Sequence, residues 1–259
     1  MEQSFKRVNI IGCPFDAISF PETIEYIRYC AVNGKRLHII TGNIDFVMIA
    51  RRDPVFMKEM WEAELVVADG MPVVWAASLL GDPIKGRVNG TDIVWECAKI
   101  SQETGIPVAF VGGDPEINEK ARINLQKHYP GSRLFPIHTP FPLKSDDNEI
   151  IVEKIREINA KIVLIALGAP KQERWIKANL DHSGASVGIG IGSAFDIISG
   201  LRPRCPHWMK NLGLEWFHRL TLEPGRLWKR YLINDSPFLF YLLIEILKRA
   251  VKKLFFTRH

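Results

Sequence analysis

The chain of 259 residues is 47% hydrophobic and carries a formal net charge of +5, which provides for one sizeable core with a smaller appendage. No apolar run approaches the roughly 18 residues of a membrane-spanning helix, and the N-terminal sequence lacks the long apolar segment of a signal peptide. The four cysteines are scattered without a CxxC pair, which predicts a reduced, cytosolic protein with neither disulfides nor a zinc site.

Short β-branched runs alternate with helix-like segments along the first 200 residues. In chain order, strands are predicted at 8–12, 37–41, 65–68, 107–111, 132–135, 161–167 and 185–191. Helices are predicted between them at 21–33, 44–61, 71–80, 91–104, 115–128, 148–159 and 170–180. This alternation predicts βαβ units, and hence a Rossmann-like α/β fold with a mostly parallel sheet and helices on both faces. The Pro-rich segment 136–147 is interpreted as a long loop within that fold.

The pattern changes near residue 200, where the alternation ends. From 201 onward there are 12 Lys and Arg against 4 Asp and Glu, whereas the first 200 residues have 22 against 25. We therefore predict an α/β catalytic core at 1–199 and a helical, basic appendage at 200–259. Such a tail favours an anionic membrane surface, a phosphorylated ligand or nucleic acid as its partner.

The segment 200–232 interleaves basic residues with large aromatic and aliphatic ones. Its basic residues are Arg202, Arg204, Lys210, Arg219, Arg226, Lys229 and Arg230. A short helical module that packs by one face and presents cations on another would suit a diphosphate. The alternative is a surface helix pair whose charges are simply solvated.

The last segment, 237–256, has a helical polar stripe. Glu245, Lys248, Arg249, Lys252 and Lys253 fall on one face, and the apolar residues lie mainly away from it. This pattern fits an amphipathic helix in a membrane interface. A helix docked on the core with a solvated polar face is the alternative.

Polar residues follow most of the predicted strands. Ligands of parallel sheets bind outside the carboxyl ends of the strands, so these residues are the candidate site. They are Thr41, Asn43, Asp69, Arg87, Asn89, Asp92, Gln172 and Asp196. Each also has an ordinary interpretation as a turn or a helix cap.

Five segments in register resemble the motifs of the WecG/TagA/CpsF glycosyltransferases (glycosyltransferase family 26). They are DGMPVV from Asp69, RVNGTD from Arg87, LGAPKQERW from Leu167, GIGSAFDIISG from Gly190, and the tail from Pro206 to Leu232. The resemblance covers roughly residues 8–232. Pro72 stands where glycine is usual and Cys205 where alanine is usual, and neither replaces a chemically active group.

The resemblance implies an inverting transfer of a sugar from a nucleotide diphosphate donor to a polyprenyl-diphosphate-linked saccharide. It implies Asp69 as the catalytic base, and we assign Thr41 to the catalytic residues as well. The chain has no Asp-x-Asp metal motif. Arginines can neutralise a leaving diphosphate through paired N–H donors. We therefore expect no metal or other cofactor, and we assign substrate contacts to Arg219, Arg226, Lys229 and Arg230 as well as to the strand-end residues.

The resulting expectation is a peripheral enzyme on the cytoplasmic face of the plasma membrane, in teichoic acid, enterobacterial common antigen, capsule or exopolysaccharide synthesis. UDP-N-acetylmannosamine is the leading donor, and UDP-glucose and UDP-N-acetylmannosaminuronate are the alternatives. Its expected partners are that donor, the lipid-linked acceptor and an anionic membrane, but not nucleic acid. The oligomeric state is not encoded in any recognisable pattern, so a homo-oligomer stays open.

Two other classes of protein compete with this interpretation. A nicotinamide-dependent oxidoreductase requires GxGxxG after the first strand, whereas this chain has Gly12-Cys13-Pro14 there. A nucleic-acid-binding module would use the basic, aromatic tail, but it leaves Thr41, Asp69, Arg87 and Gln172 without a role.

Overall fold

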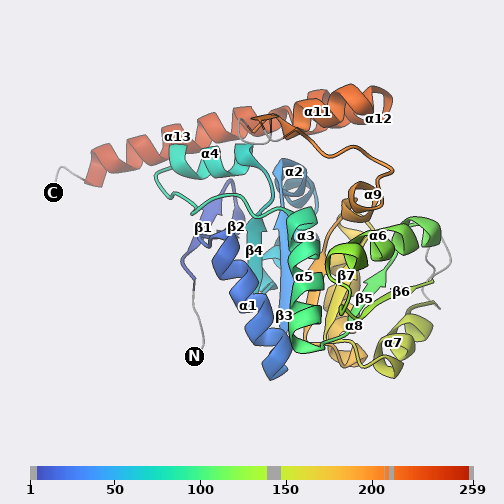
Figure 1. Ribbon diagram of the computed structural model, residues 1–259. Coiled ribbons are helices and arrows are strands. Elements are labelled where there is room, and N and C mark those ends of the chain that lie inside the picture. The colour runs from blue at the N-terminus through green and yellow to red at the C-terminus, as the bar shows by residue number, and fades with distance from the viewer. Residues whose placement is uncertain (1–4, 139–146, 207, 210–212, 257–259) are drawn as a thin grey trace.

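A six-stranded sheet forms the centre of the computed structural model, which describes residues 5–138, 147–206, 208–209 and 213–256 (Figure 1). Its strand order is β4-β3-β8-β7-β5-β6, and every neighbouring pair is parallel. The strands are β3 (Leu37–Gly42), β4 (Leu65–Ala68), β5 (Val108–Val111), β6 (Leu134–Ile137), β7 (Ile162–Ile165) and β8 (Val187–Gly190). The predicted Rossmann-like α/β class is confirmed. The predicted loop 136–147 is shorter than expected, since its first two residues belong to β6 and residue 147 begins the next helix; residues 139–146 lie outside the described part of the structure.

The first predicted strand does not join this sheet. β1 (Arg7–Ile10) pairs antiparallel with β2 (Cys13–Asp16), a strand that the sequence pattern did not predict. Between them Ile11 and Gly12 both have positive φ, 54° and 91°. Consecutive positive φ angles make a tight hairpin turn. A β-branched residue is unusual in that conformation, so the residues at this turn give no clear hairpin signal.

Helices cover both faces of the sheet because alternate strand residues point to opposite sides. They are α1 (Phe20–Asn33), α2 (Ile44–Arg52), α3 (Pro54–Glu62), α4 (Met71–Leu79), α5 (Gly90–Thr104), α6 (Pro115–His128), α7 (Asp147–Glu157), α8 (Lys171–Ser183) and α9 (Ala194–Ile198). α1, α5, α6 and α9 bury their apolar residues in one cluster. The other face is covered by α2, α3 and α4 over one half of the sheet and by α7 and α8 over the other.

The predicted helix 44–61 is in fact two helices. The side chain of Asp53 accepts hydrogen bonds from the backbone N–H groups of Val55 and Phe56 and so caps α3, whose first residue is Pro54. Proline is favoured in the first turn and strongly disfavoured in a helix interior. The chain therefore ends α2 at Arg52 and begins a new helix two residues later.

The strand order reverses between β3 and β8. β3 leads to β4 on one side, whereas β8 is followed outward by β7, β5 and β6. Such a reversal leaves a crevice at the carboxyl ends of the two central strands. Here the hydroxyl of Thr41 donates to the Gly190 carbonyl at 2.7 Å and joins the two strand ends.

A helical tail crosses this carboxyl edge (Figure 1). It contains α11 (Glu215–Leu222), α12 (Pro224–Lys229), the short π-helical segment η1 (Arg230–Asn234) and α13 (Pro237–Phe256). None of the helices in the described ranges has the length and apolar run that crossing a bilayer requires.

α13 docks on the core by one strip and leaves a second strip open. Phe238 and Leu242 are buried in the cluster that also holds α2, α3 and α4. Arg249 donates to the Leu80 carbonyl and to Asp82, at 2.7 and 2.8 Å. Five apolar side chains are more than half exposed: Leu239, Phe240, Leu243, Leu247 and Val251. The polar stripe predicted for this helix is therefore divided, since Arg249 faces the core whereas Lys248 is exposed.

Candidate active site

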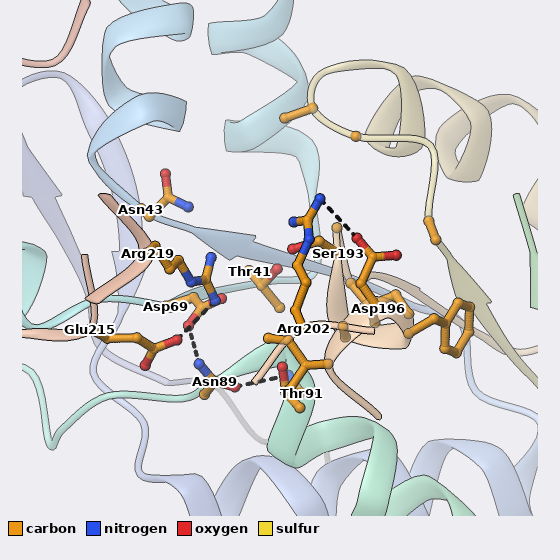
Figure 2. Close-up of a pocket in the computed structure, with 18 of the residues that line it drawn as sticks. Thr41, Asn43, Asp69, Asn89, Thr91, Ser193, Asp196, Arg202, Glu215 and Arg219 are labelled. Carbon is orange, nitrogen blue, oxygen red and sulfur yellow. Dashed lines mark hydrogen bonds and ion pairs between the residues drawn. The ribbon is translucent and has the colours of Figure 1, made fainter. Parts of the chain in front are cut away.

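A cavity of about 430 Å³ lies between the carboxyl ends of the strands and the tail (Figure 2). Its floor comes from the residues that follow β3, β4, β7 and β8, and its roof comes from α11, α12 and η1. The residues that follow the strands contribute polar side chains to the cavity, and the tail contributes arginines. Groups from distant parts of the sequence thus meet in one polar chamber.

Asp69 lies immediately after β4 and keeps part of its surface open to the cavity. One of its oxygens accepts a hydrogen bond from Asn89 Nδ2 at 3.0 Å, and its carboxylate also accepts from the backbone N–H of Gly90. Burial, and after it the nearby Glu215 carboxylate, raises its pKa to about 6 against the opposing effects of Arg219, Arg87 and the Gly90 hydrogen bond. A carboxylate with a raised pKa in a cleft is suited to accept a proton near neutral pH.

Asn89 both builds the local fold and serves the site. Its Oδ1 accepts from the backbone N–H of Thr91 and caps α5, while its Nδ2 holds Asp69. Asn43 likewise caps α2 through Asp45 N–H at 3.0 Å and lies on the cavity wall. Both residues therefore cap a helix, as the ordinary interpretation predicted, and both also line the cavity.

Gln172 joins two loops below the cavity. Its Oε1 accepts from the N–H of Gly192 at 3.2 Å, and its Nε2 donates to Glu173 Oε1 at 2.7 Å. Burial raises the pKa of Glu173 to about 7. Gly190 has no side chain because a Cβ there would lie 2.5 Å from Gln172 Nε2 and 2.7 Å from Glu173 Oε1. The β8 strand end and the first turn of α8 are thus locked together.

Glu215, on α11, bridges two of the predicted arginines. Its Oε2 accepts from Arg87 Nη1 at 2.5 Å, and its Oε1 accepts from Arg219 Nη2 at 2.8 Å. Burial opposes ionisation of Glu215, but Arg219 and Arg87 outweigh it and lower its pKa. The bridge places a guanidinium from the tail and one from the core on either side of a single carboxylate.

Other arginines of the tail are also held by carboxylates. Arg202 pairs with Asp196 at 3.2 Å and with Glu223 at 2.9 Å, and Arg204 pairs with Asp92. Arg230 lies 3.2 Å from Asp45 and 3.7 Å from Asp235. These ion pairs tie the segment that follows α9, and the segment η1, across the opening of the cavity.

Most of the residues predicted from the sequence converge on this cavity. Those in its lining are Thr41, Asn43, Asp69, Asn89, Gln172, Asp196, Arg219 and Arg230. Arg87 and Asp92 lie behind the lining, bound to Glu215 and Arg204, and Lys229 is exposed beside Trp228. Arg226 belongs to α12, but its side chain lies outside the described part of the structure.

Sequence reasoning did not identify Glu215 and Asp45, which line the cavity. Arg202, Arg204 and Ser193 also line it; the sequence placed them in candidate segments but assigned them no substrate contact. Glu215 carries a weak signal, because Glu223 is the only other acidic residue between 200 and 232, but the prediction for the tail rested on its cations alone. Asp45 carries no signal beyond lying two residues after Asn43, whereas Ser193 follows a predicted strand.

Within the described residues, no group of three or more His, Cys, Asp or Glu side chains is arranged to hold a metal ion. Among the residues that the structure describes, the guanidinium groups of Arg202, Arg204, Arg219 and Arg230 bring positive charge to the cavity. Guanidinium groups bind phosphate oxygens through paired N–H donors. The chamber therefore combines one candidate base with candidate phosphate ligands.

A parallel α/β fold with this combination at its switch point fits an enzyme that transfers a group from a phosphorylated donor. The sequence model of the glycosyl transferase WecG/TagA/CpsF family matches residues 8–252. The chain belongs to this family and is a glycosyltransferase.

Two relatives come from Staphylococcus aureus strains NCTC 8325 / PS 47 and COL, and both are named N-acetylglucosaminyldiphosphoundecaprenol N-acetyl-beta-D-mannosaminyltransferase. Each is 28% identical over 249 residues, which is 95% of this chain and 95% of the relative.

Proposed function

We propose that the protein transfers N-acetylmannosamine from its UDP derivative to a polyprenyl-diphosphate-linked N-acetylglucosamine, with inversion and without a metal ion. Support for the sugar and the acceptor comes from the names of the staphylococcal relatives. Support for the chemistry comes from Asp69, a carboxylate with a raised pKa that faces the cavity between neutral hydrogen-bond donors. That carboxylate is the observation on which the proposal chiefly depends.

In the proposed reaction, Asp69 takes the proton from the attacking hydroxyl of the acceptor sugar. The hydroxyl oxygen forms a bond to the anomeric carbon of the donor as the bond from that carbon to the diphosphate breaks. UDP leaves with the electron pair, and attack from the opposite side inverts the anomeric centre. A positioned base contributes about 10²- to 10⁴-fold to such a step.

Arg219 and Arg230 are the proposed ligands of the donor diphosphate. Arg219 donates to Glu215 through Nη2, and its Nε and Nη1 groups are the proposed donors to phosphate oxygens. The side chain of Arg230 is about one-third exposed at the cavity mouth. Hydrogen bonds that strengthen as charge develops on the leaving group lower the barrier.

A panel of donors tests the substrate assignment. UDP release would be measured with UDP-N-acetylmannosamine, UDP-glucose and UDP-N-acetylmannosaminuronate on a short-chain lipid-diphosphate acceptor carrying N-acetylglucosamine. We expect the first donor to give the highest kcat/KM and a product with the inverted anomeric configuration by NMR. Preference for another donor would refute the sugar assignment, and a retained configuration would refute the mechanism.

We also propose that the protein works at the cytoplasmic face of the membrane, with the open strip of α13 in the lipid interface. On α4, Trp75 and Leu79 are also 46% and 64% exposed, and Arg249 fastens α13 to the end of this helix. An apolar face with flanking cations suits an anionic bilayer. The lipid part of the proposed acceptor would lie in the same layer.

Introducing charged residues on α13, or at exposed apolar positions elsewhere, tests whether vesicle binding depends on this strip in particular. Leu243→Glu with Leu247→Glu should abolish co-sedimentation with phosphatidylglycerol vesicles and spare turnover of a water-soluble acceptor. Ile123→Glu with Ile150→Glu, at exposed apolar positions of α6 and α7, is the matched control and should leave vesicle binding unchanged. Equal vesicle binding by both pairs would refute the assignment. Point changes are preferable to truncation because Phe238 and Leu242 belong to the core.

A further inference from the structure

Asp69 has two arginines in its neighbourhood but an ion pair with neither. Arg219 and Arg87 both lower its pKa through space, yet within the described residues its hydrogen-bond donors are Asn89 and the backbone of Gly90, both neutral. The arginines instead donate to Glu215. Asp69, Arg219 and Glu215 lie at one end of the cavity (Figure 2), where Arg219 pairs with Glu215 and not with Asp69.

This separation matters because a direct arginine contact would disable a base. An opposite charge within hydrogen-bonding distance lowers the pKa of a carboxylate by about 1 to 3 units. Such a contact also occupies the lone pair that must accept the proton. A carboxylate of lower pKa is a weaker general base at neutral pH.

We propose that Glu215 is a positioning residue for the transfer reaction, which binds Arg219 and Arg87 and so keeps both guanidinium groups off the Asp69 carboxylate. Glu215 acts through these arginines and is not itself a catalytic residue. The inference rests on the proposed role of Asp69 as the base.

The local structure suits this role. Glu215 is the first residue of α11, and Arg219 follows at i+4 on the same helix face, where side chains of opposite charge meet. Arg87 approaches from the loop before α5, and its side chain is only 10% exposed. In a site shielded from water such pairs are stronger than at the surface, so the bridge has a firm geometry. Arg87 also links this bridge to the core.

Three charged groups of the described residues act on Asp69. Glu215 and Arg219 face it from α11, and Arg87 faces it from the loop before α5. A change at Glu215 therefore alters both the acidic neighbour and the partner of both cations. If the bridge is removed, the arginines are free to turn to Asp69.

The test is a carboxyl ¹³C NMR titration of Asp69 in the full chain, with its signal assigned by Asp69→Asn. In Glu215→Gln we expect the titration midpoint to fall by about one unit or more, and the acidic limb of the kcat/KM profile to move with it. Glu223→Gln removes a second cavity carboxylate of the tail, one that pairs with Arg202, and it should leave the midpoint unchanged. An unchanged or raised midpoint in Glu215→Gln would overturn the proposal.

A double variant separates this role from simple anchoring of α11. If Arg219 turns to Asp69 once Glu215 is lost, then adding Arg219→Ala to Glu215→Gln should raise the midpoint again. If α11 merely detaches, Asp69 becomes hydrated and the second substitution should change nothing, which would refute the proposal. The NMR titration measures the protonation of Asp69 in the absence of turnover. Full turnover by Asp69→Asn would therefore refute the base assignment independently of this result.

Discussion

Replacing Asp69 by asparagine should make the protein inactive and more stable at the same time. The folded-state pKa of Asp69 is about 6, against an ordinary value of 3.8, mainly because of burial and then because of Glu215. Keeping this carboxylate ionised at neutral pH therefore costs folding free energy, a cost that an amide of the same shape does not have. Loss of the base should lower turnover by about 10²-fold or more.

The magnitude of the stability change follows from linkage. Because the pKa is higher in the folded state, the native protein binds more protons than the unfolded chain between about pH 4 and pH 6, so the free energy of unfolding falls as pH rises through that window. The full shift corresponds to about 3 kcal/mol. The asparagine also weakens one hydrogen bond of the side chain at this position, which costs about 1 kcal/mol. We expect Asp69→Asn to be more stable by about 1 to 2 kcal/mol above pH 7, which is several degrees in Tm.

The assay is a pair of stability profiles, by calorimetry and by guanidinium titration, of wild type and Asp69→Asn from about pH 4 to pH 8. The difference should be largest at the alkaline end and should shrink toward pH 4, where Asp69 is protonated in the folded state and partly protonated in the unfolded state. Asp196→Asn is a useful control, since that carboxylate pairs with Arg202 and its loss should not stabilise the protein. A Tm of Asp69→Asn equal to or below that of wild type at neutral pH would refute the reasoning.

Three further outcomes are expected. The wild-type kcat/KM should fall about tenfold for each pH unit below about 6, following protonation of Asp69, and a flat profile down to pH 5 would contradict the assigned base. Turnover should persist in excess EDTA, and a loss that manganese or magnesium restores would show a metal requirement. Gly190→Ala should lower both the free energy of unfolding, by about 1 to 3 kcal/mol, and the activity, because its Cβ would press on Gln172 and Glu173; normal stability and turnover would show that these side chains move aside freely.

Local pattern predicted the fold class and most of the candidate site. Apolar runs and capping residues are short-range signals, so the parallel α/β architecture and the positions after each strand follow from them. Parallel strands bring their carboxyl ends to one edge, which is why Thr41, Asp69 and Gln172 could be grouped by their positions along the chain. The hairpin at Ile11 and the break before α3 were missed because each depends on one or two residues whose backbone conformation the wider pattern does not reveal.

Tertiary structure alone decided which charges meet. The sequence determined that this chain has a basic tail and an isolated Asp69, but it contains no signal that Glu215 binds Arg87, 128 residues away, or that Arg204 binds Asp92. Electrostatic effects depend on distance and burial, and neither is a property of sequence separation. Only the packing of α11 against the carboxyl edge of the sheet brings Glu215 between two arginines and leaves the neighbouring Asp69 with the neutral donors of Asn89 and Gly90.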